Sequence, residues 1–443
     1  MCYQDFSMSK SQSLIGFVGV IATIVALIWR PVYQRAIVIG VTRPQASIAS
    51  IHGLEQLKII PDTGLCEDLH LHRPSGQLYT ACQDDEAKRL KWFPPLAHFD
   101  DHKAANTGSI TVVNPDTFTS KKLKLKGFKG PLVTHGIDVW SPADDPEMVY
   151  IFAVNHLPNP LHYDASSPEA ASPEKARSQI ELFKHQVGSD DAEFVRSIRH
   201  PLIRTPNDIA ATGSDGFYVT NDHYFREGLM RQLEDGLEQN TAPWSDTVHV
   251  KIEDVKTKDP EAGLTATTAL TGLHNNNGLG FGHPHNPAEV LLVDASGGKF
   301  YRARRSLDPT AEPTLHLFDS FQLDSTLDNP SYYVDEYATT GNNASGYVLP
   351  GLARGMALGD ITNVEAPIPI MVWHLRQTSL PSEKSIGGWT PRLVFQDDGN
   401  TVRSVSGAVI VGIDPKVNGG KKQGWLFVTG FASRSMVAAK IDL

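Results

Sequence analysis

The sequence has little cysteine, no excess of basic residues and almost no long helical pattern, and each shortage excludes a class of protein. Its three cysteines are too few for a disulfide-rich scaffold, and no C-x-x-C pair is present for zinc. Cys66 and Cys82 lie on one expected hairpin, where the alternatives are a disulfide between them and two buried free thiols, and we favour the free thiols. Forty Lys and Arg stand against fifty Asp and Glu, so no basic field attracts phosphate and we expect no nucleic-acid partner. With 40% hydrophobic residues, the chain is a folded protein with a substantial core.

The first forty residues carry a membrane signal. Residues 14–29 are almost wholly apolar and approach the ~20 residues that span a bilayer. Residues 30–34 lack the small-x-small pattern of a cleavage site, so we predict an uncleaved hydrophobic transmembrane helix rather than a signal peptide or a core helix. Arg30 and Arg35 follow the run and only Lys10 precedes it, a bias that by itself places the body in the cytoplasm. We therefore divide the chain into a tail with a membrane anchor (1–42) and a body (43–443).

The body repeats a short structural phrase. It consists of strands separated by Gly, Pro, Asn and Asp, with one helical pattern at residues 227–238. A turn followed by an aromatic or aliphatic strand recurs roughly every seventy residues. The recurring strands are centred on Tyr79, Tyr150, Tyr218, Leu292, Tyr347 and Phe427. Six such units predict an all-β fold, a six-bladed β-propeller whose blades bury their faces against one another.

A polar cluster lies shortly before each recurring strand, where a half-buried strand would be apolar. The clusters are Glu67-Asp68, His135-Gly136-Ile137, Asn207-Asp208, Asn277-Gly278, Asp328-Asn329 and, in the sixth unit, Ser404 with Ser406. The innermost strand of each blade starts at one mouth of the central channel, so these positions are expected to converge there.

The converging side chains favour calcium. Two carboxylates and three amide carbonyls, those of Glu67, Asp328, Asn207, Asn277 and Asn329, supply hard oxygen donors of the kind that Ca²⁺ takes. Asp68 and Asp208 follow two of these residues in their strands and so face the opposite way. We predict that they hold a second, structural Ca²⁺ with help from backbone carbonyls.

Histidine supplies the acid–base chemistry of this prediction. His135 belongs to the converging set, and His156 lies in the next strand, where the two imidazoles are able to meet across a hairpin. An imidazole beside a metal-bound carbonyl is suited to act as a general base for water. Asp328, bound to the metal, is the alternative base or nucleophile. We expect the remaining nearby histidines to be surface or packing residues: His70, His72, His274, His283 and His285.

These segments resemble the paraoxonase/arylesterase family of calcium-dependent lactonases and esterases. The resemblance runs from about Leu54 to the C-terminus and is densest in IELFKH (180–185) and PNDIAATGSDGFYVTNDHYF (206–225). It is supported by EDL at Glu67, HGI at His135, VNH at Val154, NNGL at Asn276 and LDN at Leu327. Members of the family use an uncleaved hydrophobic N-terminus to bind membranes or lipid particles, and their bodies are lumenal or extracellular. The resemblance therefore implies a membrane-anchored protein of the secretory pathway or cell exterior, against the charge bias noted above.

The resemblance also implies a role for each site residue. It places a catalytic Ca²⁺ on Glu67, Asn207, Asn277, Asp328 and Asn329. It places a structural Ca²⁺ on Asp68, Asp208 and the backbone carbonyl of Ile137. His135 and His156 correspond to the family's histidine pair, and Asp222 with His223 to a neighbouring pair beside the site. Residues 226–239 correspond to an amphipathic lid helix, and residues 157–178 to a surface insertion. A lumenal body would make the sequon at Asn343 a glycosylation site.

Two departures from the family pattern bear on specificity. The family's disulfide between the chain ends cannot form, because no cysteine follows Cys82. The family's histidine after the fifth-blade strand is replaced by the region of Pro350, Gly351 and Leu352, so the substrate pocket is expected to differ.

The predicted function is that of a carboxylic ester hydrolase. Two calcium ions, one catalytic and one structural, would serve the hydrolysis of a small-molecule lactone or aryl ester by water that the histidine pair activates. The alternative is a membrane-tethered, non-catalytic propeller that keeps calcium for stability and binds a ligand or a protein. A sugar-lactone hydrolase or strictosidine-synthase-like propeller is a further possibility, although such a protein is not expected to carry the NDHYF motif.

Overall fold

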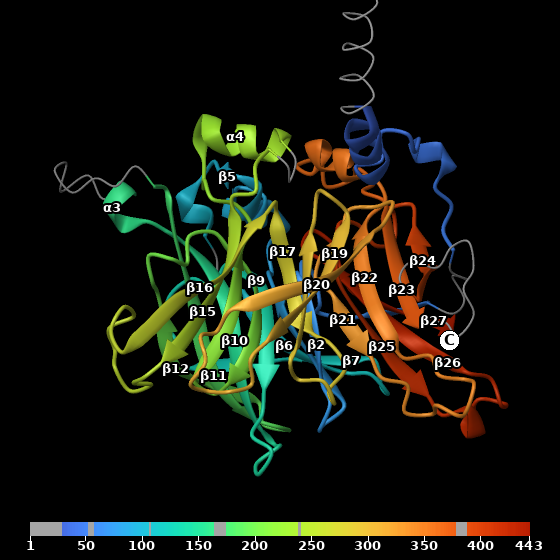
Figure 1. The fold of residues 1–443 in the computed structure, drawn as a ribbon. Helices are drawn as coiled ribbons and strands as arrows, with labels where there is room; N and C mark the ends of the chain where they lie inside the picture. The colour runs from blue at the N-terminus through green and yellow to red at the C-terminus, as the bar shows by residue number, and fades with distance from the viewer. Residues whose placement is uncertain (1–28, 52–56, 106–107, 164–173, 238–240, 378–387) are drawn as a thin grey trace, which may run out of the picture.

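The computed structural model describes residues 29–51, 57–105, 108–163, 174–237, 241–377 and 388–443 (Figure 1). These residues form six large, mainly antiparallel sheets and one small two-stranded sheet. In chain order, the first sheet comprises β2 (Asp68–His72), β3 (Gln77–Cys82), β6 (Ser109–Asn114) and β7 (Thr119–Lys122). The second comprises β9 (Thr134–Trp140), β10 (Met148–Pro158), β11 (Ala176–Gln186) and β12 (Asp191–Ile198), with β8 (Lys124–Lys126) parallel at the edge. The third comprises β13 (Pro206–Gly213), β14 (Gly216–Asn221), β15 (Ser245–Ile252) and β16 (Leu264–Leu273). The fourth comprises β17 (Asn276–Phe281), β18 (Glu289–Asp294), β19 (Lys299–Arg305) and β20 (Leu315–Gln322). The fifth comprises β21 (Ser331–Tyr333), β22 (Gly346–Leu352), β23 (Ile370–Gln377) and β24 (Trp389–Asp397). The sixth comprises β25 (Val405–Ile413), β26 (Gln423–Gly430), β27 (Met436–Asp442) and β1 (Leu57–Ile60).

The first strands of the sheets meet around a common axis. β2 contacts β9, β9 contacts β13, β13 contacts β17, β17 contacts β21, β21 contacts β25, and β25 returns to β2. This closed ring makes each sheet a blade of a six-bladed β-propeller, as predicted. The recurring aromatic and aliphatic residues all lie in the second strand of a blade: β3, β10, β14, β18, β22 and β26.

The ring is closed by the N-terminal strand of the body. β1 pairs with β27 in antiparallel register, with Ile60 opposite Met436, and so supplies the outermost strand of the last blade. Residues from the two ends of the chain therefore complete one sheet, and separating the ends would break both the sheet and the ring. The domain boundary at residue 42 precedes this strand and stays a prediction.

The hydrophobic core is divided among the spaces between blades. Six clusters of buried apolar side chains each join two successive blades, including the last and the first. Between the second and third blades, for example, Phe152 packs on Phe217 with 5.3 Å between ring centroids, and both are fully buried. Truncating such a residue to alanine costs about 3–5 kcal/mol. Each blade is thus apolar on both faces, which leaves the channel mouth as the place for the polar clusters.

One end of the propeller carries the extra elements. A segment between β3 and β6 holds α2 (Glu86–Arg89), β4 (Trp92–Phe93), η3 (Pro94–Leu96), β5 (His98–Phe99) and η4 (His102–Ala104). The same end carries α4 (Gly228–Gly236), η6 (Gly355–Asp360) and a helical segment at residues 29–38 (Figure 1). The remaining short helices are η1 (Gln45–Ser47), α3 (Pro160–Tyr163) and η7 (Pro415–Val417). α4 lies within the predicted lid region, and α3 within the predicted surface insertion.

The predicted membrane anchor falls largely outside the described residues, which begin at Trp29. Among the helices that the structure does describe, none is both long enough and apolar enough to cross a membrane.

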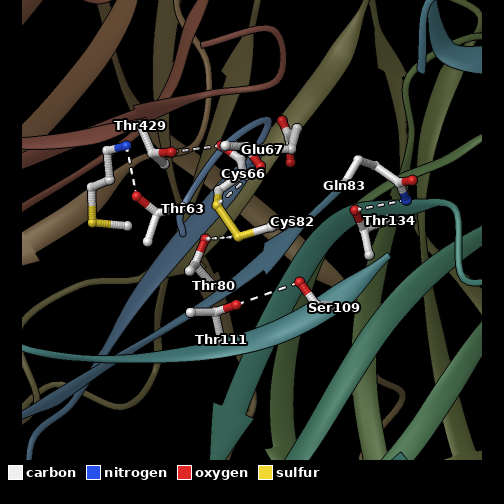
Figure 2. Close-up of a disulfide and its surroundings, with 12 residues drawn as sticks. Thr63, Cys66, Glu67, Thr80, Cys82, Gln83, Ser109, Thr111, Thr134 and Thr429 are labelled. Atoms are coloured by element: carbon white, nitrogen blue, oxygen red, sulfur yellow. Dashed lines mark hydrogen bonds between the residues drawn. A yellow bond between two sulfur atoms is a disulfide. The ribbon is translucent and has the colours of Figure 1, made fainter. Parts of the chain in front are cut away.

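Cys66 and Cys82 form a disulfide, which corrects the prediction of two free thiols (Figure 2). Just before β2, the Glu67 N–H donates to the Ala81 carbonyl and the Gln83 N–H donates to the Leu65 carbonyl, so Cys66 lies directly opposite Cys82. Both are fully buried, and Glu67 follows Cys66 directly at the mouth of the channel. The disulfide therefore restrains the backbone where a predicted calcium ligand projects.

Candidate metal and catalytic site

The predicted site residues gather where the first strands of the blades begin. Glu67, Asn207, Asn277 and Asp328 line one cavity of about 210 Å³, which His135, Asp222 and His223 also line. The fifth predicted ligand, Asn329, is buried beside them and donates a hydrogen bond from its amide nitrogen to Glu67 Oε1 at 3.1 Å. Residues far apart in sequence therefore meet at one place, because five of the six blades contribute the start of their innermost strand.

Glycine permits the close approach of neighbouring blades at this point. A Cβ atom placed on Gly278 would lie 2.6 Å from the Cα of Asn329, closer than real side chains come to backbone. Gly136 stands in the same relation to Asp208, since its Cβ would lie 2.6 Å from the Cα of that residue. Both glycines belong to the predicted polar clusters, and any larger residue would push the ligand-bearing strands apart.

The five predicted calcium ligands share one property. Each has a buried side-chain oxygen with no hydrogen-bond partner among the described residues: Glu67 Oε2, Asn207 Oδ1, Asn277 Oδ1, Asp328 Oδ1 and Asn329 Oδ1. Buried polar atoms are nearly always paired, so such atoms require an explanation, and an unseen ion is one. The donor set is oxygen only and includes two carboxylates, which fits Ca²⁺.

The electrostatics of the cavity point the same way. Burial raises the pKa of Glu67 to about 8, and the negative charge of Asp68 adds to the effect. Burial and the charge of Glu67 raise the pKa of Asp328 well above its ordinary value. The carboxyl groups of Glu67, Asp68 and Asp328 therefore cannot all be ionised in this buried place unless a cation is bound.

The predicted histidine pair is in contact. His135 Nδ1 lies 3.1 Å from His156 Nε2, and His156 Nδ1 lies 2.8 Å from Ser178 Oγ. Burial lowers the pKa of His135 to about 4 and that of His156 well below its ordinary value, so both rings are neutral at pH 7. His135 Nε2 faces the cavity, 3.5 Å from the Asn207 amide nitrogen and 3.8 Å from Glu67 Oε1.

Asp222 and His223 connect the cavity to helix α4. His223 lies 3.0 Å from Asp222 through Nδ1 and 2.7 Å from Asp235 of α4 through Nε2. Burial alone would raise the pKa of Asp222, but the contact with His223 lowers it overall. Asp222 in turn accepts a hydrogen bond of 3.4 Å from the Asn207 amide. Asp222 and His223 thus connect Asn207, a predicted calcium ligand, to helix α4.

Asp68 and Asp208 do not line this cavity and lie together in a second cluster. The ligand atoms of Asp68, His70 and Asp208 all lie within 4.8 Å of one another, an arrangement that could hold a metal ion. Asp68 also accepts a hydrogen bond of 3.1 Å from the Ile137 amide, and the assignment of the Ile137 carbonyl as a ligand stays a prediction. His70 was expected to be a surface or packing residue, and the structure instead places it inside this cluster.

Sequence reasoning missed several residues that shape the cavity. Arg89 is buried, stacks 3.7 Å above the Phe93 ring and donates a 2.6 Å hydrogen bond to the Thr134 carbonyl. Burial lowers its pKa to about 9, while Glu67 opposes this change. The cavity itself is also lined by residues of five separate segments: Phe93, Leu96, Arg231, His274, Leu352 and Phe431. Leu352 lies in the region where the pocket was expected to differ, whereas His274, expected to be a surface or packing residue, is buried and lines the cavity. No role was assigned from the sequence to Phe93, Leu96 and Phe431.

Residues 88–268 match the sequence model of the Arylesterase family. The chain is 34% identical to serum paraoxonase/arylesterase 2 of Gallus gallus over 132 residues, 30% of this chain and 31% of that protein. It is 32% identical to serum paraoxonase/arylesterase 1 of Homo sapiens over 116 residues, 26% of each. Over this part of its length the chain is similar to members of the paraoxonase/arylesterase family.

This similarity lies in the middle of the chain. The matches span about a third or less of the length of these relatives. The matched range contains His135, His156, Asn207 and Asp222, whereas Glu67, Asn277 and Asp328 lie outside it. Among solved structures, a luciferin-regenerating enzyme aligns over 89% of this chain and 96% of its own at 9% identity, with a TM-score of 0.44, too distant to bear on function.

Proposed function

We propose that this chain is a calcium-dependent hydrolase of lactones and aryl esters. The observation that carries the proposal is the set of five buried, unpartnered oxygens at the channel mouth, beside a neutral histidine pair and a cavity. The similarity to this family supports the reaction class, since the Arylesterase model matches the part of the chain that holds both histidines and relatives named paraoxonase/arylesterase are similar to the chain.

Calcium bound by these five oxygens would polarise the carbonyl of the substrate and stabilise negative charge on its oxygen. The protein supplies the proton acceptor. His135 Nε2 carries a lone pair towards the cavity if its Nδ1 proton is donated to His156 Nε2. His156 then donates its own Nδ1 proton to Ser178 Oγ, so the chain of bonds fixes one tautomer for both rings.

In this mechanism His135 accepts a proton from the attacking water and His156 orients it. Asp328 stays the alternative base, because its Oδ1 is unpartnered in the same cavity. The apolar part of the substrate packs on the wall formed by Phe93, Leu352 and Phe431. A buried wall of this kind also keeps bulk water from the reacting carbonyl.

The direct test is hydrolysis of γ- and δ-lactones and of phenyl acetate by the full chain, before and after calcium chelation. We expect turnover that the chelator abolishes and added Ca²⁺ restores. A folded, calcium-loaded protein that hydrolyses none of these substrates would refute the hydrolase and favour a non-catalytic, ligand-binding propeller.

We also propose that the protein is membrane-anchored, in the secretory pathway or at the cell exterior, with the helix-bearing end against the membrane. α4 turns apolar side chains outward, with Leu229 70% exposed, while its Arg231 and Glu234 are buried. Trp29 and Tyr33 are exposed on the segment 29–38 at the same end (Figure 1). Such apolar faces suit the interface of a bilayer. The disulfide is typical of oxidising compartments.

The two segments at this end are joined. Arg35 donates hydrogen bonds to the carbonyls of Leu237 and Asp235, at 2.7 and 2.8 Å, and so links residues 29–38 to the end of α4. Replacing Leu229 with Ser should weaken binding to lipid vesicles, whereas the matched change of Leu317, exposed on β20, should not. The sequon residue Asn343 is exposed, and we expect a glycosidase-sensitive mass shift when the chain is secreted.

A further inference from the structure

We propose that Asn275 and Ser296 are specificity-determining residues, which bind a hydroxyl group on the lactone or ester that the site hydrolyses. The proposal rests on the proposed function and narrows its substrate class to hydroxylated lactones and esters. Both residues line the cavity together with the predicted calcium ligand Asn277, and neither belongs to the calcium site or to the histidine pair.

Asn275 and Ser296 lie across the channel mouth from the apolar wall of the cavity. Asn275 directly precedes β17 and Ser296 follows β18, so both belong to the fourth blade. Phe93 lies in the insertion of the first blade, and Phe431 follows β26 of the sixth blade. In the closed ring the first and fourth blades stand on opposite sides of the axis. A bound substrate therefore meets apolar side chains on one side and hydrogen-bonding groups on the other.

The two residues are held together by hydrogen bonds from the backbone. The Ser296 N–H donates to Asn275 Oδ1 at 3.0 Å, and the Ala295 N–H donates to the Asn275 carbonyl at 3.1 Å. Asn275 has a φ of 42°, in the left-handed region that residues other than glycine rarely adopt. Such a conformation persists only where the surrounding contacts enforce it, and it is common at ligand sites. These contacts therefore fix both residues at the edge of the cavity.

Both side chains retain hydrogen-bonding capacity that the protein does not use. Among the described residues, Asn275 Nδ2 has no acceptor, and Ser296 Oγ has a single long contact, 3.4 Å from His274 Nδ1. Arg231 and Asp235, which also line the cavity, are by contrast paired with each other at 3.0 Å. A ligand group that reproduces the hydrogen bonds of solvent at Asn275 and Ser296 can displace that solvent without loss of affinity.

A hydroxyl group matches this pair of residues better than a charged or an apolar group. It can accept a hydrogen bond from Asn275 Nδ2 and exchange one with Ser296 Oγ, which both donates and accepts. A carboxylate would add negative charge beside Glu67, Asp222 and Asp328, which line the same cavity. An apolar substituent would leave both polar side chains without a partner. Sites that bond a substrate hydroxyl discriminate strongly against analogues that lack it.

The test is the ratio of kcat/KM for two lactones matched in carbon number, one of which bears a hydroxyl group. The panel consists of γ- and δ-lactones with the hydroxyl on different ring and side-chain carbons. We expect the wild-type protein to prefer at least one hydroxylated member by roughly 3–10-fold, the effect of an uncharged hydrogen bond. Ser296→Ala and Asn275→Gly should each bring this ratio towards one, and glycine tolerates the left-handed backbone at that position. Ser306→Ala, at an exposed serine, is the matched control and should keep the wild-type ratio.

Binding measured apart from turnover separates the hydroxyl site from the proposed reaction. The corresponding lactams keep the ring and the hydroxyl group but resist hydrolysis, and calorimetry measures their affinity for the calcium-loaded protein. Tighter binding of the hydroxylated lactam, lost in a folded Ser296→Ala protein, supports the site even if no lactone is hydrolysed. A wild-type protein without a hydroxyl preference in turnover or in binding would overturn the proposal, as would a preference that both folded variants retain.

Discussion

Removal of calcium is expected to destabilise the propeller by an amount that the structure allows to be worked out. Five buried oxygens, those of Glu67, Asn207, Asn277, Asp328 and Asn329, have no partner among the described residues. A buried polar atom without a partner costs roughly 1–3 kcal/mol, so the set costs roughly 5–15 kcal/mol when no ion is bound. That is as large as the whole stability of an ordinary domain.

The corresponding change in melting temperature is measurable. Unfolding entropy of ~2.1 cal/mol/K per residue gives ~0.9 kcal/mol/K for a chain of 443 residues. The loss therefore lowers Tm by roughly 5–16 °C. Differential scanning calorimetry of the calcium-loaded protein and of the same protein after chelation, with calcium content checked by elemental analysis, measures this change.

A matched pair of variants locates the effect. Asn277→Ala removes one of the five oxygens and should reduce the stabilisation that calcium provides. Asn286→Ala, at an exposed asparagine, should leave it unchanged. The reasoning is refuted if the calcium-free protein melts at the same temperature as the loaded protein, because the five oxygens would then be satisfied in another way.

Three further predictions concern the same site. His135→Gln should lower kcat for lactones by about 10²–10⁴-fold with an unchanged melting curve, because a general base is lost. The control variant His316→Gln, at an exposed histidine, should keep full activity. Normal turnover by the His135→Gln protein would reject the histidine dyad. The pKa of Glu67 rises from 4.5 to about 8 in the cation-free protein, so calcium must displace a proton at pH 7 and its affinity should increase as the pH rises towards 8. Calorimetry in buffers of different ionisation enthalpy measures the released proton. Equal apparent binding enthalpies in all buffers would contradict the assignment of Glu67 as a ligand. Replacing Cys66 and Cys82 with Ser should weaken calcium binding, titrated by calorimetry, because Glu67 adjoins the disulfide; an unchanged affinity would show that the bond serves stability alone.

Several features of this protein follow from the sequence alone. The spacing of the strands centred on Tyr79, Tyr150 and their counterparts predicted six blades, because every blade must bury the same apolar second strand against its neighbours. The common phase of the polar clusters predicted that Glu67 and Asp328 would meet despite their distance in the chain. Both features are local patterns that repeat along the chain, so they can be recognised in a single sequence without knowledge of the tertiary structure.

Other features were decided by the tertiary structure. The disulfide depends on the register of β2 against β3, which sets whether two sulfurs meet or pass, and no composition rule fixes that register. The role of His70 depends on Asp138 and Asp208, which come from two other blades. The same holds for Arg89, whose place beside Glu67 is set by an insertion folded over the channel mouth. The sequence alone thus determined the repeating architecture, whereas the partners of individual buried polar groups were chosen by contacts between segments that only the closed ring brings together.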